Sequence, residues 1–178
     1  MVCWQALDGV DGIGATLYAN QWDNMANRQA HIDGTGPEIL QQLRDAFGLP
    51  HTAAAPLDAF SCAMGTGGTL TGVAQAVRGA AELGTCAAQS GKAPMVALTD
   101  PCGAALVSYY NEGELRSEGD SISEGIGQGR VTGNMADFTP DLAMEVHDEE
   151  MMKVIQDLQV TIAAASAACQ GCWIVAHV

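Results

Sequence analysis

A glycine-rich turn between an apolar strand and an amphipathic helix limits this chain to few architectures. Residues 57–64 are a short, mostly apolar run, typical of a buried strand. Residues 69–83 place Leu70, Val73, Ala74 and Val77 on one helical face. Between them stand five residues that join the strand to the helix: Gly65, Thr66, Gly67, Gly68 and Thr69. A strand, a tight turn and a helix in this order are typical of an α/β protein.

The turn has the composition of an anion-binding loop. Glycine lets the backbone approach a ligand, the start of a helix presents unpaired N–H groups, and the two threonines add hydroxyl donors, which together suit a phosphate. The spacing excludes a Rossmann fingerprint, because Leu70 stands at the third glycine position, and a P-loop, because the lysine is absent. A plain glycine turn explains the same residues equally well.

Helical and strand-like segments alternate from residue 35 onward, which predicts a three-layer α/β fold with a largely parallel sheet flanked by helices. Thr35 is expected to cap the first helix, with Pro37 in its first turn. Further strands are expected at 94–99, ended by Asp100-Pro101, and at 142–146. A short helix is expected after Pro101, and a longer one over 148–158.

A long surface loop is expected over residues 111–134, which are rich in glycine, serine and acids. Gly125, Gly127 and Gly129 would let this loop form a backbone wall against a flat ligand. Glycine in a mobile loop also occurs without any chemical role, so the pattern alone leaves both readings open.

Charge and length narrow the possible partners. The 178 residues fit one domain, and 7 basic against 21 acidic residues give a net charge of −14. Nucleic acid and anionic membranes are therefore poor partners. Residues 1–15 do not resemble a signal or transit peptide, and the alanine-rich residues 160–178 lack the transfer energy of a membrane span. We expect a cytoplasmic protein.

Cysteine and histidine give no defensible metal or nucleophile motif. Cys169 and Cys172 form a CxxC pair, but no second pair accompanies it, and the other cysteines are isolated along the chain. The four histidines lack ligand spacing and are expected at the surface or at caps. The sequence alone assigns no catalytic residue and no metal site.

Three segments together resemble the cysteine synthase family of pyridoxal-phosphate enzymes, fold type II. The first is NQWDNMAN at 20–27, followed by His31 and TGPEI at 35–39. The second is GTGGTLTG at 65–72, and the third combines Asp100-Pro101 with EGIGQGRVT at 124–132. The resemblance implies an incomplete enzyme-like domain over residues 19–158, with divergent segments at 1–18 and 159–178.

The resemblance also implies a cofactor, roles and partners. Pyridoxal 5′-phosphate would place its phosphate on Gly65 to Thr69, with Gly125 and Gly127 near the ring and Gln21 facing the substrate carboxylate. The implied reaction is β-replacement, in which O-acetylserine and sulfide give cysteine. The implied protein partners are a second copy of the chain and serine acetyltransferase.

The sequence departs from the family pattern at the lysine that forms the Schiff base. Only Lys92 and Lys153 are present, and neither stands in that context. The family's substrate loop is absent, and Ser166 stands in an alanine run where the family has its serine turn. We therefore expect a truncated copy that is inactive by itself. The alternatives are a non-catalytic module that binds a phosphate ligand and a degenerate paralogue that binds a protein partner.

Overall fold

The computed structural model describes residues 5–7, 16–161 and 172–173. Its central sheet has the strand order β7-β6-β4-β8, built from β4 (Ala59–Cys62), β6 (Met95–Pro101), β7 (Leu142–Val146) and β8 (Cys172–Trp173). The pairs β4–β6 and β6–β7 are parallel, whereas β8 runs antiparallel to β4. A parallel pair of short strands, β3 (Ala55–Pro56) and β5 (Cys86–Ala87), and an antiparallel pair, β1 (Gln5–Leu7) and β2 (Thr16–Tyr18), lie outside this sheet.

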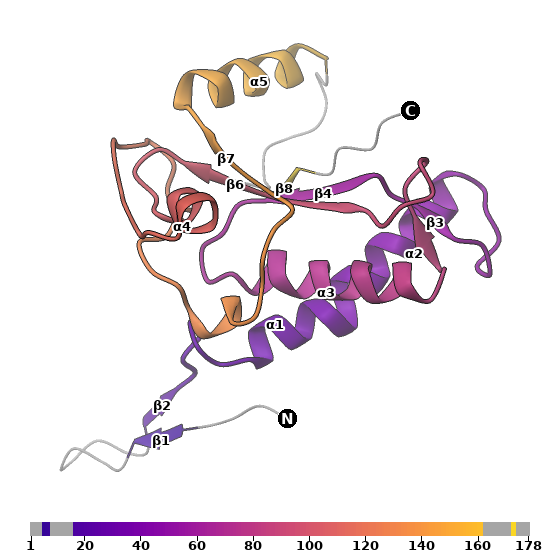
Figure 1. The fold of residues 1–178 in the computed structure, drawn as a ribbon, viewed down its shortest axis with the longest axis horizontal. Coiled ribbons are helices and arrows are strands. Elements are labelled where there is room, and N and C mark those ends of the chain that lie inside the picture. The colour runs from indigo at the N-terminus through magenta and orange to yellow at the C-terminus, as the bar shows by residue number, and fades with distance from the viewer. Residues whose placement is uncertain (1–4, 8–15, 162–171, 174–178) are drawn as a thin grey trace.

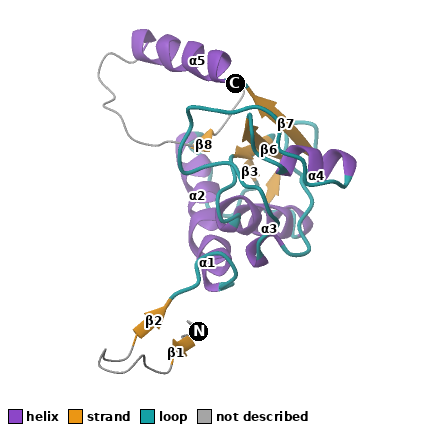
Figure 2. Ribbon diagram, turned by 90° about the vertical axis from the view of Figure 1, so that its left-hand side faces the viewer, coloured by secondary structure: helices purple, strands orange, loops and turns teal. Residues whose placement is uncertain are grey.

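Helices lie on both sides of the sheet (Figures 1 and 2). On one side are α1 (Ala26–Ala30), a π-helical turn (His31–Thr35), α2 (Gly36–Ala46), α3 (Gly68–Glu82) and α4 (Leu106–Glu112). On the other side is α5 (Asp148–Thr161), which follows β7. The expected fold class, α/β with a largely parallel sheet flanked by helices, is confirmed.

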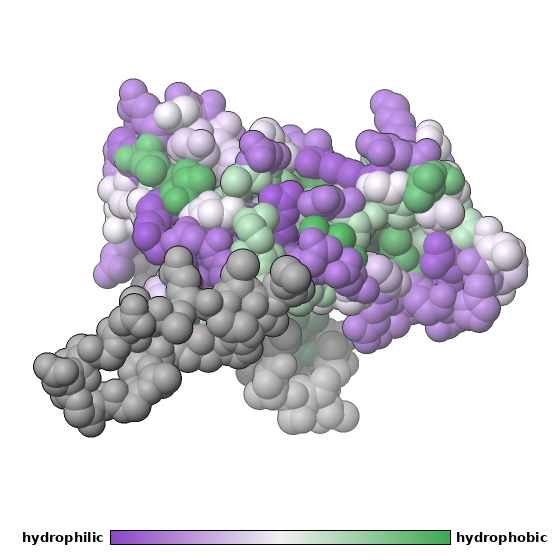
Figure 3. Space-filling view, turned by 90° about the horizontal axis from the view of Figure 1, so that it is seen from below, coloured by the Kyte–Doolittle hydropathy of each residue, from purple (hydrophilic) through white to green (hydrophobic). Residues whose placement is uncertain are grey.

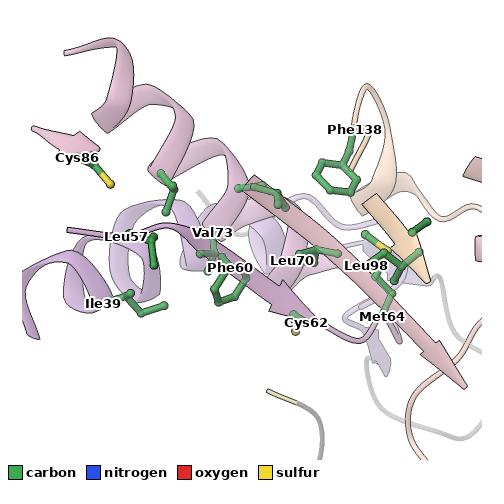
Figure 4. Packing of buried hydrophobic residues seen from close by; sticks show 14 of the residues in the cluster. Ile39, Leu57, Phe60, Cys62, Met64, Leu70, Val73, Cys86, Leu98 and Phe138 are labelled. Atoms are coloured by element: carbon green, nitrogen blue, oxygen red, sulfur yellow. The ribbon is translucent and has the colours of Figure 1, made fainter. Parts of the chain in front are cut away.

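The hydrophobic core lies between the sheet and α3 (Figure 4). The apolar stripe predicted from the helical period is buried, since Leu70, Val73 and Val77 have no exposed surface. Phe60 and Leu98, from neighbouring strands, pack in the same cluster. Alternation along the strand therefore gives β4 one buried face, while β6 is buried over most of its length.

The first helix begins earlier than expected, and the prediction that Thr35 caps it is wrong. Thr35 has helical dihedral angles of −58° and −44°, and its Oγ1 lies 2.9 Å from Nδ1 of His31 instead of capping α2. The π-helical turn joins α1 to α2, and the N–H of Gly36 donates to the carbonyl of His31. A π-turn tolerates Pro37 directly after it, because the regular ladder of N–H donors is already interrupted there.

The other predicted elements are found, with shifted ends. Strand β6 extends through Pro101 and does not stop at Thr99, because proline at the last position removes only one ladder donor and keeps the preceding residue extended. Strand β7, helix α3 and helix α5 match the predicted segments. The loop expected at 111–134 is shorter at both ends, because α4 continues through Glu112 and a 3₁₀ turn begins at Gly133.

The pairing of β6 with β7 is set at its start by Asp141. The N–H of Asp141 donates to the carbonyl of Val96 at 2.8 Å, and its Oδ2 accepts from the N–H of Val96 at 2.7 Å and from Nη2 of Arg78 at 3.1 Å. From there the register runs from Ala97 opposite Leu142 to Pro101 opposite Val146.

Within the described residues, no helix has the length and apolar character needed to cross a membrane. Figure 3 shows the molecule from below, where hydrophilic side chains cover much of the surface and apolar ones form separate patches. The candidate membrane stretch at 160–178, Ser166 and Cys169 fall mostly or wholly outside the described residues.

Candidate functional site

The glycine-rich turn connects the end of β4 to the start of α3. Gly67 has a φ of +87°, which favours glycine, and a Cβ at this position would lie 2.5 Å from Cγ of Met135. A Cβ on Gly68 would collide with the side-chain amide of Asn27. Two glycines of the turn are thus required by the packing of their neighbours, and the backbone follows a tight path into the helix.

The backbone N–H groups of this turn have no hydrogen-bond partner among the described residues. No described residue provides a hydrogen-bond acceptor for the N–H groups of residues 66–69, and the first capping contact of the helix is the N–H of Thr71 on the carbonyl of Gly67 at 3.1 Å. Unpaired N–H groups at a helix start carry partial positive charge and bind anions. We call residues 65–69 the amide cup.

Neighbouring side chains fix both threonines of the amide cup. Thr66 Oγ1 accepts a hydrogen bond of 2.9 Å from Nδ2 of Asn27, and the carbonyl of Thr66 accepts one of 2.7 Å from Oγ1 of Thr132. Thr69 Oγ1 lies 3.2 Å from Nε2 of His31. Because the hydroxyl hydrogen of Thr66 is not used in the bond from Asn27, it remains available for an anion.

The predicted second loop lies beside the amide cup. The N–H of Gly127 donates to the carbonyl of Met64 at 2.8 Å, and a Cβ on Gly65 would lie 3.1 Å from the carbonyl of Gly125. Both Gly125 and Gly127 have positive φ, +78° and +80°. The structure therefore brings together the two glycine clusters that the sequence separates by 60 residues.

Gln21 lies in the segment that anchors α1 next to the amide cup. Its carbonyl accepts hydrogen bonds from Nδ2 of Asn27 at 3.0 Å and from Nδ2 of Asn134 at 2.9 Å. Asn134 is fully buried, and it also accepts from the N–H of Arg28 at 3.2 Å. This role of Asn134 was not predicted from sequence, because nothing in its local pattern marks a residue that bonds to a partner 113 positions away.

Two titratable groups near the site are perturbed by burial. Desolvation lowers the pKa of His31. Asp100 is 1% exposed, and burial raises the pKa of its carboxyl to about 6, while the N–H groups of Leu106 and Val107 oppose that rise. Because Asp100 Oδ2 accepts from the N–H of Leu106, its visible role is to cap α4.

Neither lysine lies at the amide cup. Lys92 precedes β6, at the end of the sheet where β4 also begins, whereas the cup follows the carboxyl end of β4. Lys153 is exposed within α5, on the other side of the sheet. Neither of these lysines therefore supplies an amine at the cup.

An open groove of about 830 Å³ lies between α2 and α3. Its lining includes Leu40, Arg44, Gln75 and Leu83 and none of the residues of the amide cup or the second loop. Its volume therefore gives no information on the candidate site.

Comparison with known proteins identifies the family. Residues 11–169 match the family model described as "Pyridoxal-phosphate dependent enzyme". The chain is 36% identical over 155 residues to cysteine synthase 1 of Neurospora crassa, covering 85% of this chain and 36% of that protein. It is 38% identical over 149 residues to cysteine synthase 1 of Emericella nidulans, covering 82% of this chain and 35% of that protein. The chain thus spans about a third of the length of these curated relatives.

The fold is similar to that of solved enzymes. A hydrogen sulfide-producing enzyme of Fusobacterium nucleatum has a TM-score of 0.59 at 20% identity, covering 80% of this chain and 39% of that chain. An O-acetylserine dependent cystathionine β-synthase of Helicobacter pylori has a TM-score of 0.55 at 21% identity, covering 79% and 37%. The family match extends over most of the described residues, including both glycine clusters. The chain therefore belongs to the pyridoxal-phosphate dependent enzyme family.

Proposed function

We propose that this chain supplies the phosphate-binding part of a β-replacement enzyme of the cysteine synthase type. The domain that does so spans residues 19–158. The observation that carries the proposal is the set of unpaired N–H groups at residues 66–69, at the start of the fifteen-residue helix α3. Such a cup suits the phosphate of pyridoxal 5′-phosphate, the cofactor of the family.

The residues present fit the phosphate end of the cofactor. The amide cup supplies neighbouring N–H donors and the Thr66 hydroxyl. These donors suit an anion, although the chain as a whole has a net charge of −14. In the proposal Gly65 to Thr69 hold the phosphate, Gly125 and Gly127 lie near the ring, and Gln21 faces the substrate carboxylate. The fixed positions of Thr66 and Thr69 lower the entropic cost of binding.

The proposed reaction converts O-acetylserine and sulfide to cysteine. When bound, the cofactor supplies an electron sink for loss of the α-proton and the β-substituent. This chain's residues would hold the phosphate, orient the ring through the Gly125–Gly127 backbone and receive the substrate carboxylate at Gln21. The names of the curated relatives, cysteine synthase 1 in two fungi, support this substrate class.

A second candidate, a phosphate-ligand module without catalysis, is favoured by the positions of the lysines. Lys92 lies at the opposite end of the sheet from the amide cup, and β4 alone spans about 13 Å. The cup therefore binds the phosphate without a covalent link to either lysine. In this form the isolated chain binds the ligand and makes no cysteine.

The test measures phosphate recognition apart from catalysis. The purified chain is titrated with pyridoxamine 5′-phosphate, which needs no lysine, and with pyridoxamine, which lacks the phosphate. Saturable binding of the first and none of the second supports the amide cup. The variant Thr66→Ala is expected to weaken binding roughly fivefold or more. The exposed Thr139→Ala variant is the matched control. Equal binding of both ligands, or of neither, would contradict the proposal.

Borohydride reduction in the presence of pyridoxal 5′-phosphate separates the two candidates. Specific labelling of one lysine, with cysteine formed from O-acetylserine and sulfide, supports an enzyme. Phosphate-dependent binding without labelling or turnover supports the binding module.

The proposal includes two protein partners from the family resemblance, a second copy of the chain and the tail of serine acetyltransferase. Light scattering after gel filtration measures the first association. The second is measured by titrating the tail peptide in the presence and absence of pyridoxamine 5′-phosphate. A peptide that uses the proposed site competes with the phosphate ligand, whereas binding unaffected by it would place the peptide elsewhere.

A further inference from the structure

Three side chains with metal-ligating atoms meet at the carboxyl end of β6 and β7. Cys102 Sγ lies 3.1 Å from Nδ1 of His147 and 3.4 Å from Oε1 of Glu145. Nε2 of His147 lies 3.6 Å from the same carboxylate oxygen. One ligand atom from each residue lies within 4.8 Å of the other two. No metal site was predicted from sequence, because Cys102 is isolated along the chain and His147 lacks a recognised ligand spacing.

The strand register explains why the three residues meet. Pro101 pairs with Val146 in the parallel ladder, so the next residues of both strands, Cys102 and His147, leave the sheet side by side. Glu145 precedes His147 by two positions, and such residues share one face of a strand. Gly103, with a φ of +83°, then turns the chain away, leaving the thiol at the edge.

We propose that Cys102, Glu145 and His147 bind a divalent transition-metal ion of the zinc class. Thiolate, imidazole and carboxylate are the ligands that Zn²⁺ takes in proteins, at about 2.0–2.3 Å. Ligand atoms arranged tetrahedrally at those distances are separated by about 3.3–3.8 Å. The separations of 3.1 and 3.4 Å from the thiol sulfur are close to this range. Three protein ligands leave one coordination position for water.

The surroundings of the Cys102 thiol favour a cation, because the carboxylate of Glu145 lies 3.4 Å from its sulfur and the acidic residue Asp148 directly follows His147. When the ion binds, the S–H bond breaks, the proton passes to solvent, and the sulfur electron pair forms the bond to the metal.

Cobalt binding tests the site directly and does not involve the cofactor. The full chain carries Cys169→Ser and Cys172→Ser so that the CxxC pair cannot bind the ion. Titration with Co²⁺ is expected to produce a thiolate-to-cobalt charge-transfer band that saturates at one equivalent and is removed by Zn²⁺. Cys102→Ala is expected to abolish the band. His147→Ala and Glu145→Gln are expected to weaken Co²⁺ affinity at least about tenfold.

The control is His51→Ala, which changes an exposed histidine on another part of the surface and should leave the titration unchanged. Far-ultraviolet circular dichroism of each variant verifies that the fold is kept. The proposal is overturned if the parent gives no band, or if the band persists in folded Cys102→Ala or with unchanged affinity in folded His147→Ala. Failure of pyridoxamine phosphate binding would not affect this result.

Discussion

Asn27 of α1 donates a hydrogen bond of 2.9 Å from Nδ2 to Oγ1 of Thr66, so a helix and a turn 39 residues apart share one polar contact. The same Nδ2 donates to the carbonyl of Gln21 at 3.0 Å. The Asn27 amide also fills the space beside Gly68 that a Cβ would need. One side chain thus aligns the Gln21 segment, the Thr66 hydroxyl and the start of α3.

Asn27→Ala is expected to weaken pyridoxamine 5′-phosphate binding roughly five- to thirtyfold, because a lost hydrogen bond of about 1–2 kcal/mol frees the Thr66 hydroxyl from its position. Fluorescence titration of the ligand measures the change. Gln29→Ala removes an exposed side chain of the same helix that bonds to Asp33, and it should leave the affinity unaltered. Equal affinities for Asn27→Ala and the parent would show that the contact does not position the cup.

Gly67→Ala is expected to lower the free energy of unfolding by about 1–3 kcal/mol, because alanine at a φ of +87° is strained and its Cβ meets Met135. Urea denaturation measures the loss. Gly79→Ala is the matched control within α3, where nothing lies within 4 Å of the added Cβ. That substitution should instead stabilise the protein by about 0.5–1 kcal/mol. A neutral Gly67→Ala variant would mean that the turn adopts another backbone path.

Gly127→Ala is expected to detach the second loop from the amide cup. Its Cβ would lie 2.8 Å from Cγ of Pro101 and 3.2 Å from Cβ of Ala104, at a φ of +80°. We expect faster amide hydrogen exchange over residues 123–130. The increase should include the N–H of residue 127, because its hydrogen bond to the carbonyl of Met64 would break. Gly129→Ala, with open space around the added Cβ, should exchange like the parent.

The stability of the protein is expected to fall in acid through His31. Burial lowers the pKa of His31 below its ordinary value of 6.5, so the unfolded chain binds a proton first as the pH falls. The folded protein therefore has its full stability with respect to His31 above pH 6.5, and it loses stability as the pH falls below that value. Urea denaturation at pH 7.5 and 5.5 should show a smaller loss for His31→Gln than for the parent.

His51→Gln, at an exposed histidine, is the control for this pH series and should keep the parental difference between the two pH values. Comparing variants also separates His31 from Asp100. The raised pKa of Asp100 has the opposite effect, because the contribution of Asp100 to the stability of the folded protein is lost as the pH rises through about 6. An identical acid loss in His31→Gln and the parent would assign the effect to other groups.

Short-range sequence patterns were enough to predict the helices and strands that depend on residues close together in the chain. The buried stripe of α3 follows directly from its helical period, and the strand predicted at 142–146 is found at the same residues. The π-helical turn and the helical state of Thr35 were not predicted, because the cap residues there match an ordinary helix start. Only contacts in the folded chain, such as that of Thr35 with His31, distinguish a π-helical turn from an ordinary helix start.

The candidate site was only partly predictable, for the same reason. The glycine clusters carry a recognisable composition, so the amide cup and the second loop could be proposed from sequence. Thr132 and Asn134 lie in a segment without periodicity, and their bonds to Thr66 and Gln21 depend on the tertiary fold. The meeting of Cys102 with His147 depends on the strand register, which the spacing of residues along the chain does not contain.

The contacts of Asp141 with Val96 and Arg78 have consequences at the far end of the ladder. A shift of β7 by one residue would turn each of its side chains to the opposite face and separate His147 from Cys102. The carboxylate that begins the pairing therefore controls, across the whole length of both strands, whether the thiol and the imidazole meet. A wrong alignment at Asp141 would therefore separate the proposed metal ligands about 20 Å away along the strands.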